Sequence, residues 1–222
     1  PTFGRVSRYG AVPLGYSLDH MGPLTRTVRD AALVLNAIAG YDRRDPNSVR
    51  RPLENLLPPD EIPSLAGVKI GLPENFFFDR VDLQVDNAVH FMAYRAQDLG
   101  AELVPLRVPD GRQLNTISQI TLLVEAAAVH EPYIRKQRKL YGADVRTLID
   151  MGRTIPGVDY VQAQRLRRRA QGVYRSILKQ VDCLLVPATP ITAPNIGQDE
   201  VAIGGETEDV RIAATRLARG IN

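Results

Sequence analysis

Residues 68–106 contain a strand, a helix and a second strand in succession, and this order constrains the fold more than any other feature of the chain. The apolar segment 68–72 is followed by proline, which is typical of a short strand. Asp82 is predicted to cap a helix of about five turns that ends at Gly100. Residues 102–106 form the second predicted strand. Because a strand, a long helix and a strand make a parallel crossover, we expect an α/β fold with a mixed sheet covered by helices.

A second helix is predicted near the start of the chain. Thr27 stands where a helix N-cap is expected, with Asp30 three residues later, which is a capping-box pattern, and Gly40 follows as a stop. Spacings of three and four define the apolar faces that we expect the two helices to bury. These are Val28, Ala31, Ala32, Leu35, Ile38 and Ala39 in the first, and Val85, Ala88, Val89, Met92, Ala96 and Leu99 in the second.

The remaining segments predict further helices and one buried strand. Residues 41–67, rich in Pro, Arg, Asp and Asn, are expected to be a surface loop. We expect helices over residues 114–141, with a kink or break at Pro132, and over residues 144–151 and 159–179. Residues 181–186 are continuously apolar, as in a strand buried on both faces, which would make the single cysteine, Cys183, a buried and inert thiol. Residues 187–205 are expected to be a loop.

Composition restricts the class of protein. A chain of 222 residues with 44% hydrophobic content and no long polar linker is expected to form one domain over residues 1–222. The net charge of +3 gives little support to nucleic-acid binding. No stretch approaches the roughly 18 apolar residues that a membrane helix needs, so no membrane partner is expected. One cysteine favours a reducing compartment, and hence a cytoplasmic location.

The usual catalytic and ligand-binding motifs are missing from the sequence. His20, His90 and His130 share no metal-ligand spacing, so neither a metal nor a cofactor is predicted. We expect His90 to be partly exposed or hydrogen-bonded, and His130 to form a solvated pair with Glu131. None of the serines stands in a glycine-rich strand-to-turn setting. The arginines at 165 and 167–169 are expected to form a solvated helix face, with RNA contact as the alternative.

Gly4 and Gly10 flank two arginines, Arg5 and Arg8. This spacing fits a turn that carries paired surface arginines, and it leaves an anion-binding nest as the alternative.

The opening forty residues resemble the amidase signature family of hydrolases. That family carries Lys-Pro-Thr-Tyr/Phe-Gly-Arg-Val-Ser, followed by Ser-Leu-Asp-x-x-Gly-Pro-Met/Leu-x-Arg-Thr/Ser-Val-x-Asp-Ala-Ala. The similarity continues to the end of the chain. The matching residues of the opening are Pro1, Thr2, Phe3, Gly4, Arg5, Val6, Ser7, Ser17, Leu18, Asp19, Gly22, Pro23, Leu24, Arg26, Thr27, Val28 and Asp30.

The resemblance implies an amide hydrolase whose catalytic residues lie elsewhere. In this family a serine attacks the amide carbonyl, a second serine with a cis peptide bond relays the proton to a lysine, and all three precede the Lys-Pro-Thr segment. We therefore expect no catalytic residue in this chain, which would be a part of an amidase domain truncated at both ends. Without its N-terminal catalytic half, the chain is expected to expose apolar surface.

The resemblance also suggests residues that serve the site. Supporting residues would be Asp19, Gly22, Arg26 and Asp30, although Asp30 also has the simpler capping role. Substrate-binding candidates are Thr116, Glu125, Thr189 and Thr215. The helix around residues 116–130 resembles one that lines the substrate channel, and residues 187–195 would form another rim of the cleft.

The resemblance implies a small-molecule amide as substrate, and it leaves two kinds of enzyme open. Glutaminase subunits of tRNA-dependent amidotransferases resemble the opening best, but they place an Asp where this chain has Thr215, and an Arg where it has Thr147 or Leu148, beside Arg146. We therefore favour a stand-alone amidase on small or aliphatic amides. A non-catalytic binding module of the same fold is a further alternative, and a homodimer is compatible with either.

Overall fold

The computed structural model describes residues 2–52, 54–60 and 64–221. They divide into two units, each made of two stretches of chain. Unit 1 comprises residues 1–62 and 121–155, and unit 2 comprises residues 63–120 and 156–222. Because the stretches alternate along the sequence, neither unit is one continuous piece. That all 222 residues act as one domain stays a prediction.

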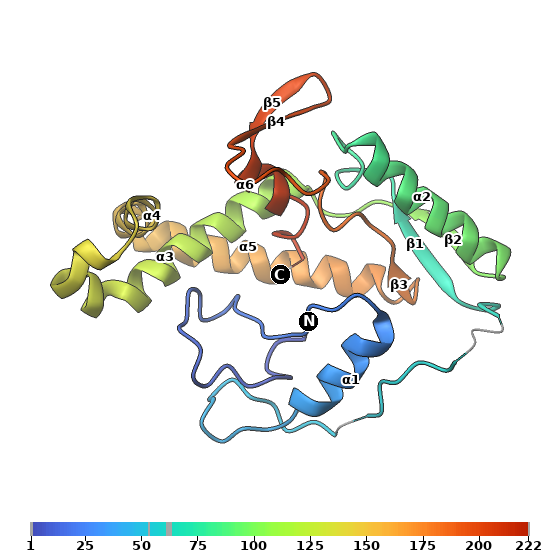
Figure 1. The fold of residues 1–222 in the computed structure, drawn as a ribbon, viewed down its shortest axis with the longest axis horizontal. Helices are drawn as coiled ribbons and strands as arrows, with labels where there is room; N and C mark the ends of the chain where they lie inside the picture. Colours follow the sequence, from blue (N-terminus) through green and yellow to red (C-terminus); the bar gives the residue numbers. More distant parts are fainter. Residues whose placement is uncertain (1, 53, 61–63, 222) are drawn as a thin grey trace. The chain divides into compact units, whose positions relative to one another are not determined.

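Unit 2 is built on a parallel sheet with the strand order β2-β1-β3. Strand β1 (Lys69–Pro73) pairs with β2 (Glu102–Leu106) and with β3 (Cys183–Leu184), so that Ile70 lies opposite both Leu103 and Cys183. Helix α2 (Leu83–Asp98) connects β1 to β2 and is capped by Asp82, whose carboxylate accepts the N–H of Gln84 at 2.8 Å (Figure 1). The α/β class and the parallel crossover are thus confirmed.

The core of unit 2 is formed by residues of its helices together with residues that follow or precede its strands. Helix α5 (Gly157–Ile177) leads into β3, and its Ala163 packs against Leu114 and Ile117 at the start of α3 (Gly111–Gln137). The largest cluster joins the ends of the strands to the end of the chain. It comprises Phe76, Phe77, Val108, Ile177, Val181 and Leu217.

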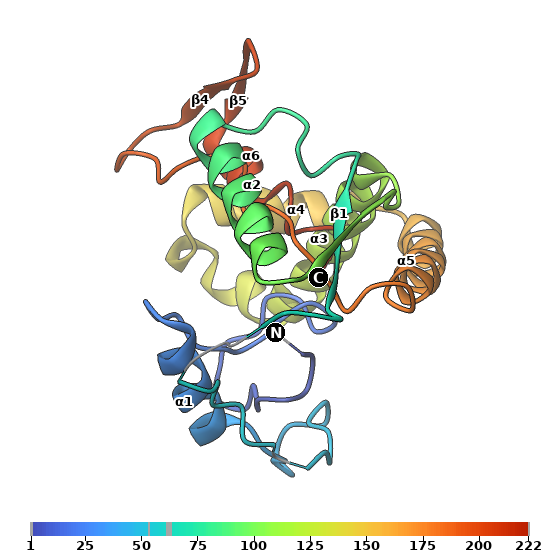
Figure 2. The ribbon, with the colours of Figure 1, turned by 90° about the vertical axis from the view of Figure 1, so that its right-hand side faces the viewer.

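Unit 2 also contains a hairpin that was not predicted from the sequence. Strands β4 (Glu200–Ile203) and β5 (Glu206–Asp209) are antiparallel and precede helix α6 (Val210–Thr215). They are joined by Gly204 and Gly205, with φ of 59° and 81°, the two-residue turn that favours glycine. The hairpin extends beyond α6 in both views (Figure 2).

Three predictions about unit 2 are wrong in detail. The strand expected over residues 181–186 is only two residues long and lies at an edge of the sheet, so Cys183 is exposed rather than buried. Helix α2 turns a slightly different face inward, with Ala93 as its buried residue and Met92 57% exposed. These errors arise because an apolar sequence pattern does not show which strands or helices pack against the segment, and those neighbours determine which side chains are buried.

Unit 1 consists of long loops, helix α1 (Val28–Ile38), the second part of α3, the 3-10 helix η1 (Arg138–Leu140) and helix α4 (Ala143–Thr154). Thr27 caps α1 as predicted, since its hydroxyl accepts the N–H of Asp30 at 3.0 Å. Helix α3 is not divided at Pro132. The core cluster of unit 1 joins α3 to α4 through Ala127, Ile134 and Ile149.

Helix α1 leaves most of its apolar side chains exposed. Ala32 is its only buried residue, whereas Val28 is 77% and Ile38 44% exposed. Within the stripe predicted to be buried, Ala32 is buried, Ala31, Leu35 and Ala39 are half-buried, and Val28 and Ile38 are exposed, so the stripe is only partly covered. Residues 41–52, 54–60 and 64–67 contain no helix or strand, so the predicted surface loop is confirmed over these ranges.

Candidate functional site

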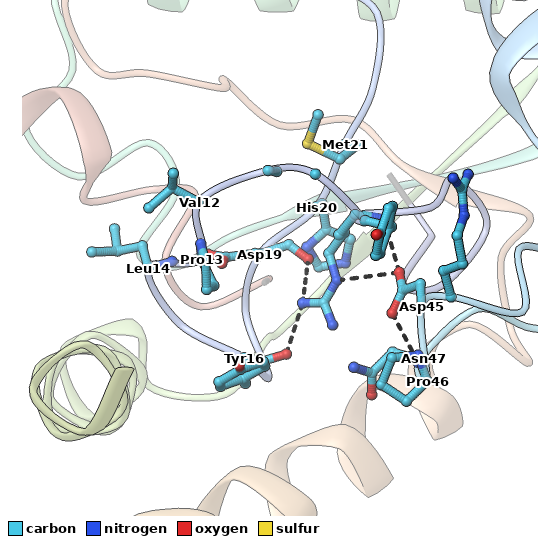
Figure 3. Close-up of a pocket in the computed structure, with 15 residues that line it drawn as sticks. Val12, Pro13, Leu14, Tyr16, Asp19, His20, Met21, Asp45, Pro46 and Asn47 are labelled. Atoms are coloured by element: carbon cyan, nitrogen blue, oxygen red, sulfur yellow. Dashed lines mark hydrogen bonds and ion pairs between the residues drawn. The ribbon is translucent and has the colours of Figure 1, made fainter. Parts of the chain in front are cut away.

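The loop of residues 8–19 in unit 1, here called the wall loop, is held in shape by its own polar side chains. The Asp19 carboxylate accepts the N–H groups of Leu14 and Gly15 at 2.8 and 3.1 Å. The Arg8 guanidinium donates through Nη1 to the carbonyl oxygens of Tyr16 at 2.8 Å and Asp19 at 3.3 Å (Figure 3). These bonds satisfy main-chain groups that have no helix or strand partner.

Arg8 and Asp45 form a buried charge pair behind the wall loop. Their side chains are 11% and 4% exposed, and Arg8 Nε lies 3.8 Å from Asp45 Oδ2. The Asp45 carboxylate also accepts the main-chain N–H of Arg8 at 2.8 Å and of Asn47 at 2.9 Å. The pKa of Asp45 is held below its usual value, chiefly because the Arg8 N–H donates to the charged carboxylate. The Asn47 N–H and the charge of Arg8 act in the same direction, and together these interactions outweigh the desolvation that would raise the pKa.

This arrangement corrects the prediction of paired surface arginines. Arg8 is buried against the loop, with its guanidinium 4.7 Å from the centre of the Phe3 ring. Arg5 donates to the carbonyl oxygens of Arg51 and Pro52. Both arginines therefore organise loops of unit 1.

The wall loop is fastened to helix α3 by Ser17 and Glu125. The Ser17 main-chain N–H donates to Glu125 Oε2 at 2.8 Å, and its hydroxyl donates to Oε1 at 2.6 Å. Glu125 is only 8% exposed, so both bonds are shielded from bulk water. A carboxylate that accepts two bonds from one residue holds that residue in position and orientation.

Among the cavities formed by the described residues of unit 1 are two that share part of the wall loop. One, of about 380 Å³, is bordered by Arg8, Asp19, His20, Arg44 and Asp45 among others. The other, of about 820 Å³, is here called the aromatic groove. Its lining residues are Ala11, Val12, Pro13, Tyr16, Ala128, Val129, His130, Pro132, Tyr133, Gln137, Leu140 and Tyr141.

His130 and Tyr141 form a polar pair within the aromatic groove. His130 Nδ1 and the Tyr141 hydroxyl are 3.1 Å apart, and the rings meet edge to face with centres 5.5 Å apart. The prediction that His130 pairs with Glu131 in solvent is wrong. Glu131 instead forms ion pairs with Arg135 and Arg153.

The structure separates the predicted site residues between the units. Glu125 and Asp19 both act on the wall loop in unit 1. Thr116 and Thr215 lie in unit 2, are exposed, and donate their hydroxyls to the carbonyls of Arg112 and Arg211 in their own helices, at 3.1 and 2.7 Å. Thr189 is half-buried in unit 2. No hydrogen bond joins any two of the three threonines within the described ranges, and their substrate contacts stay predictions.

The predicted supporting residues differ in what they contact. Asp19 holds the wall loop, while the main chain of Asp30 bonds to Thr27. Gly22 and Arg26 are exposed. A role for these two in the site stays a prediction.

Ser17, Asp45 and Tyr141 have roles in unit 1 that were not predicted from the sequence. Ser17 stands in the family motif, and the run Asp45-Pro46-Asn47-Ser48 carries a turn signal in which Asp45 accepts the Asn47 N–H. Neither signal shows which distant residue is the partner.

The described part of the chain contains no group of three or more His, Cys, Asp or Glu side chains that could hold a metal ion. Likewise, none of the helices in residues 2–52, 54–60 and 64–221 is long and apolar enough to cross a membrane.

Comparisons with known proteins give a consistent family. The amidase family model matches residues 1–215. An amidase of Pseudomonas putida is 40% identical over 226 residues, covering 98% of this chain and 47% of that protein. A glutamyl-tRNA(Gln) amidotransferase subunit of Maridesulfovibrio salexigens is 31% identical over 223 residues, covering 89% and 46%. The chain thus spans about half the length of the curated relatives it matches.

Solved structures agree with this assignment. An inhibitor-bound structure from a vestigial protein complex, linked to the origins of an s-triazine catabolic enzyme, superposes with a TM-score of 0.87 at 28% identity. A crystal structure of an amidase gives 0.82 at 29%. Each covers 100% of this chain, which in turn covers 47% of each of those chains. The resemblance in the opening motif is confirmed, and the chain belongs to the amidase signature family.

Proposed function

We propose that this chain is the part of an amide hydrolase that follows its catalytic serines. The whole protein would cleave carboxylic amide C–N bonds with a serine, cis-serine and lysine triad upstream of Pro1. The observation that carries this proposal is the family match over residues 1–215, together with relatives about twice as long.

The surroundings of the serines support a nucleophile outside this chain. A serine nucleophile needs a base within hydrogen-bond reach of its hydroxyl. Here Ser7 and Ser17 donate to carboxylates that already serve the loops, namely Asp42 and Glu125. The other hydroxyls with a described partner donate to main-chain carbonyls: Ser48 to Gly40, Ser64 to Leu99 and Ser176 to Gly172. On this proposal the segment alone is inactive.

The role proposed for this chain is to build a wall of the substrate site. The wall loop is fixed by Asp19, Arg8 and Glu125, so it would present a rigid surface to a ligand. Rigid positioning of substrate is a main contribution of a protein to such reactions. The partners proposed are a small-molecule amide and the N-terminal catalytic half, with a homodimer as a compatible assembly.

A glutaminase subunit of a tRNA-dependent amidotransferase is the second candidate. Several relatives are named as glutamyl-tRNA(Gln) amidotransferase subunits, including one of Oleidesulfovibrio alaskensis at 33% identity. The family residues expected to hold the charged ends of glutamine are replaced here. Thr215 and Thr147 donate their hydroxyls to carbonyls of their own helices, and Leu148 is apolar. A stand-alone amidase is therefore favoured.

A non-catalytic binding module of the same fold is the third candidate. It would be expected to carry polar residues wherever the catalytic half once packed, but the exposed face of α1 keeps Val28, Leu33 and Ile38. We propose a cytoplasmic location because the chain has one cysteine and no disulfide framework.

The test is ammonia release by the protein encoded in the complete reading frame. Propionamide, benzamide and glutamine should be offered separately. Release from propionamide or benzamide supports a stand-alone amidase, and release from glutamine alone supports the amidotransferase. A complete protein that hydrolyses none of them would favour the binding module.

A further inference from the structure

We propose that the aromatic groove binds an uncharged aromatic amide, and this proposal rests on the amide-hydrolase function argued above. The groove lies within unit 1, between the wall loop and the second part of α3 with the η1 turn after it. Its volume of about 820 Å³ falls within the range of roughly 300–1,000 Å³ that is usual for small-molecule sites.

The groove gathers exposed apolar and aromatic side chains on one surface. Tyr16 and Tyr133 are 57% and 59% exposed, and Val12 and Leu140 are 83% and 79% exposed. Scattered exposed apolar residues are ordinary, but several that line one hollow mark a binding surface. Tyrosine faces offer flat contact to an aromatic ring, which aliphatic amides cannot match.

The charge of the groove selects against amino-acid substrates. None of its twelve lining residues is Asp, Glu, Lys or Arg. The nearby Glu131 is already paired with Arg135 and Arg153. A zwitterion such as glutamine would lose hydration of its ammonium and carboxylate in the groove without gaining a counter-charge there. An uncharged amide avoids this cost.

His130 and Tyr141 supply a polar anchor that suits an uncharged ligand. If Tyr141 donates to His130 Nδ1, the Nε2–H remains a donor and the tyrosine oxygen an acceptor. If His130 donates instead, the tyrosine hydroxyl remains a donor and Nε2 an acceptor. Either tautomer therefore offers one donor and one acceptor, which a carboxamide or phenol can match.

The wall loop gives the groove a fixed width. Tyr16 lines the groove, and its carbonyl accepts a bond from Arg8, while the next residue, Ser17, is bound to Glu125 on α3. The bond from Arg8 fixes the shape of the wall loop itself, and the bond to Glu125 ties the loop to α3. A preformed hollow of this kind binds rigid ligands with little ordering cost.

The proposal is tested on the protein encoded in the complete reading frame, with benzamide as the probe. Tyr133→Ala removes a groove ring, and Tyr94→Ala removes a ring of similar exposure, 60%, on α2 in unit 2. Saturation-transfer NMR reports benzamide binding without any need for turnover. Steady-state kinetics with benzamide give KM and kcat in parallel.

We expect Tyr133→Ala to raise the KM for benzamide about tenfold, leave kcat within about twofold, and weaken the NMR signal. Tyr141→Phe should weaken binding by a smaller factor, and Tyr94→Ala should leave it unchanged. If the protein hydrolysed benzamide and neither Tyr133→Ala nor Tyr141→Phe changed binding or KM, the groove would not be the binding site. The proposed amide-hydrolase function would still stand. If Tyr133→Ala lowered the thermal midpoint of unfolding but left the KM for benzamide unchanged, another part of the complete protein would cover the groove. That result would also overturn the proposal.

Binding of benzamide that Tyr133→Ala abolishes, in a protein that hydrolyses no amide, would support the groove and contradict the hydrolase function. Equal binding of glutamine and benzamide to the wild-type protein would refute the selectivity against charged substrates.

Discussion

Ser17 donates both its main-chain N–H and its hydroxyl to the buried carboxylate of Glu125, a residue 108 positions further along the chain. This contact fastens the wall loop to helix α3, next to Tyr16, which lines the aromatic groove. Glu125 was predicted from the sequence to bind substrate. In the structure its carboxylate holds the loop that borders the groove, and its contact with substrate stays a prediction.

Removing either partner of this contact should destabilise the protein. Glu125→Ala leaves two Ser17 donors without an acceptor, and we expect a loss of about 2–3 kcal/mol in the free energy of unfolding. Ser17→Ala removes only the hydroxyl and should cost about 1 kcal/mol. The coupling energy from a double-mutant cycle in urea should be about 1 kcal/mol.

Ser176→Ala is a matched control for this cycle. Its hydroxyl donates to the Gly172 carbonyl within its own helix at an exposed position, so the change should be within about 0.5 kcal/mol. If the effects of the Ser17 and Glu125 substitutions on the free energy of unfolding were additive, the contact between these two residues would not stabilise the protein.

Helices α3 and α4 should tolerate no side chain at Gly152. A Cβ at this position would overlap the Leu123 carbonyl and lie 3.0 Å from the Ala127 Cβ. Gly152→Ala is therefore expected to lower the free energy of unfolding by about 3 kcal/mol, because main chain must move to admit it. Thermal and urea unfolding would measure the loss.

Gly172→Ala also replaces a glycine within a helix, but it is expected to have the opposite effect on the free energy of unfolding. Gly172 lies within α5 and nothing surrounds its added Cβ within 4 Å, so alanine should stabilise the helix by about 0.5–1 kcal/mol. Similar effects from the two substitutions would contradict the close approach of α3 and α4.

Acid should weaken unit 1 partly through Asp45. Folding lowers the pKa of this carboxyl from its ordinary 3.8, chiefly because the Arg8 N–H bonds to the charged form. The unfolded state therefore binds a proton more readily, so the stabilisation is complete above the unfolded pKa and is lost as pH falls through the folded pKa. Asp45→Asn should flatten the decline in stability between about pH 5 and pH 2, measured by urea unfolding.

The same substitution has a separate cost at neutral pH. It leaves the buried Arg8 charge without its partner, and we expect a loss of about 3 kcal/mol. A variant with wild-type stability at pH 7 and an unchanged slope in acid would be inconsistent with this charge pair.

Arg216 should anchor the loop before α2 in unit 2. It is 7% exposed and donates to the carbonyls of Asp79 and Arg80 at 2.9 and 2.5 Å, with Glu208 Oε2 3.7 Å from its Nε. Arg216→Ala is expected to cost about 3 kcal/mol in the free energy of unfolding. Arg211→Ala, whose side chain is 77% exposed, should change it by no more than about 0.5 kcal/mol. If both substitutions lowered the free energy of unfolding equally, Arg216 would not have the anchoring role described.

Local signals predicted much of the fold. The caps at Thr27 and Asp82 and the strands at 69–73 and 102–106 follow from residues within a few positions of each other. The hairpin of β4 and β5 was missed, and the strand at Cys183 was predicted to be longer and more buried than it is, because in each case the local signals compete. The Gly204-Gly205 turn is typical of a hairpin, but the flanking strands contain four acidic residues and no clear alternation. The strand at Cys183 is apolar enough to be central, yet it lies at an edge of the sheet.

The site was harder to predict than the fold. Asp19, Glu125 and His130 could be singled out from the chain, but their partners are distant or unremarkable residues, namely main-chain groups, Ser17 and Tyr141. Arg8 resembled a surface arginine because it stands in a glycine-containing turn. Only the tertiary fold shows that its charge is buried against Asp45.

The location of the nucleophile is the central claim, and labelling with a fluorophosphonate tests it most directly. The protein encoded in the complete reading frame should be labelled, digested and mapped by mass spectrometry. We predict that the modified serine precedes Pro1 and that the six serines of this chain, at 7, 17, 48, 64, 118 and 176, remain unmodified. Stoichiometric label on any of those six, with loss of amide hydrolysis, would contradict the account.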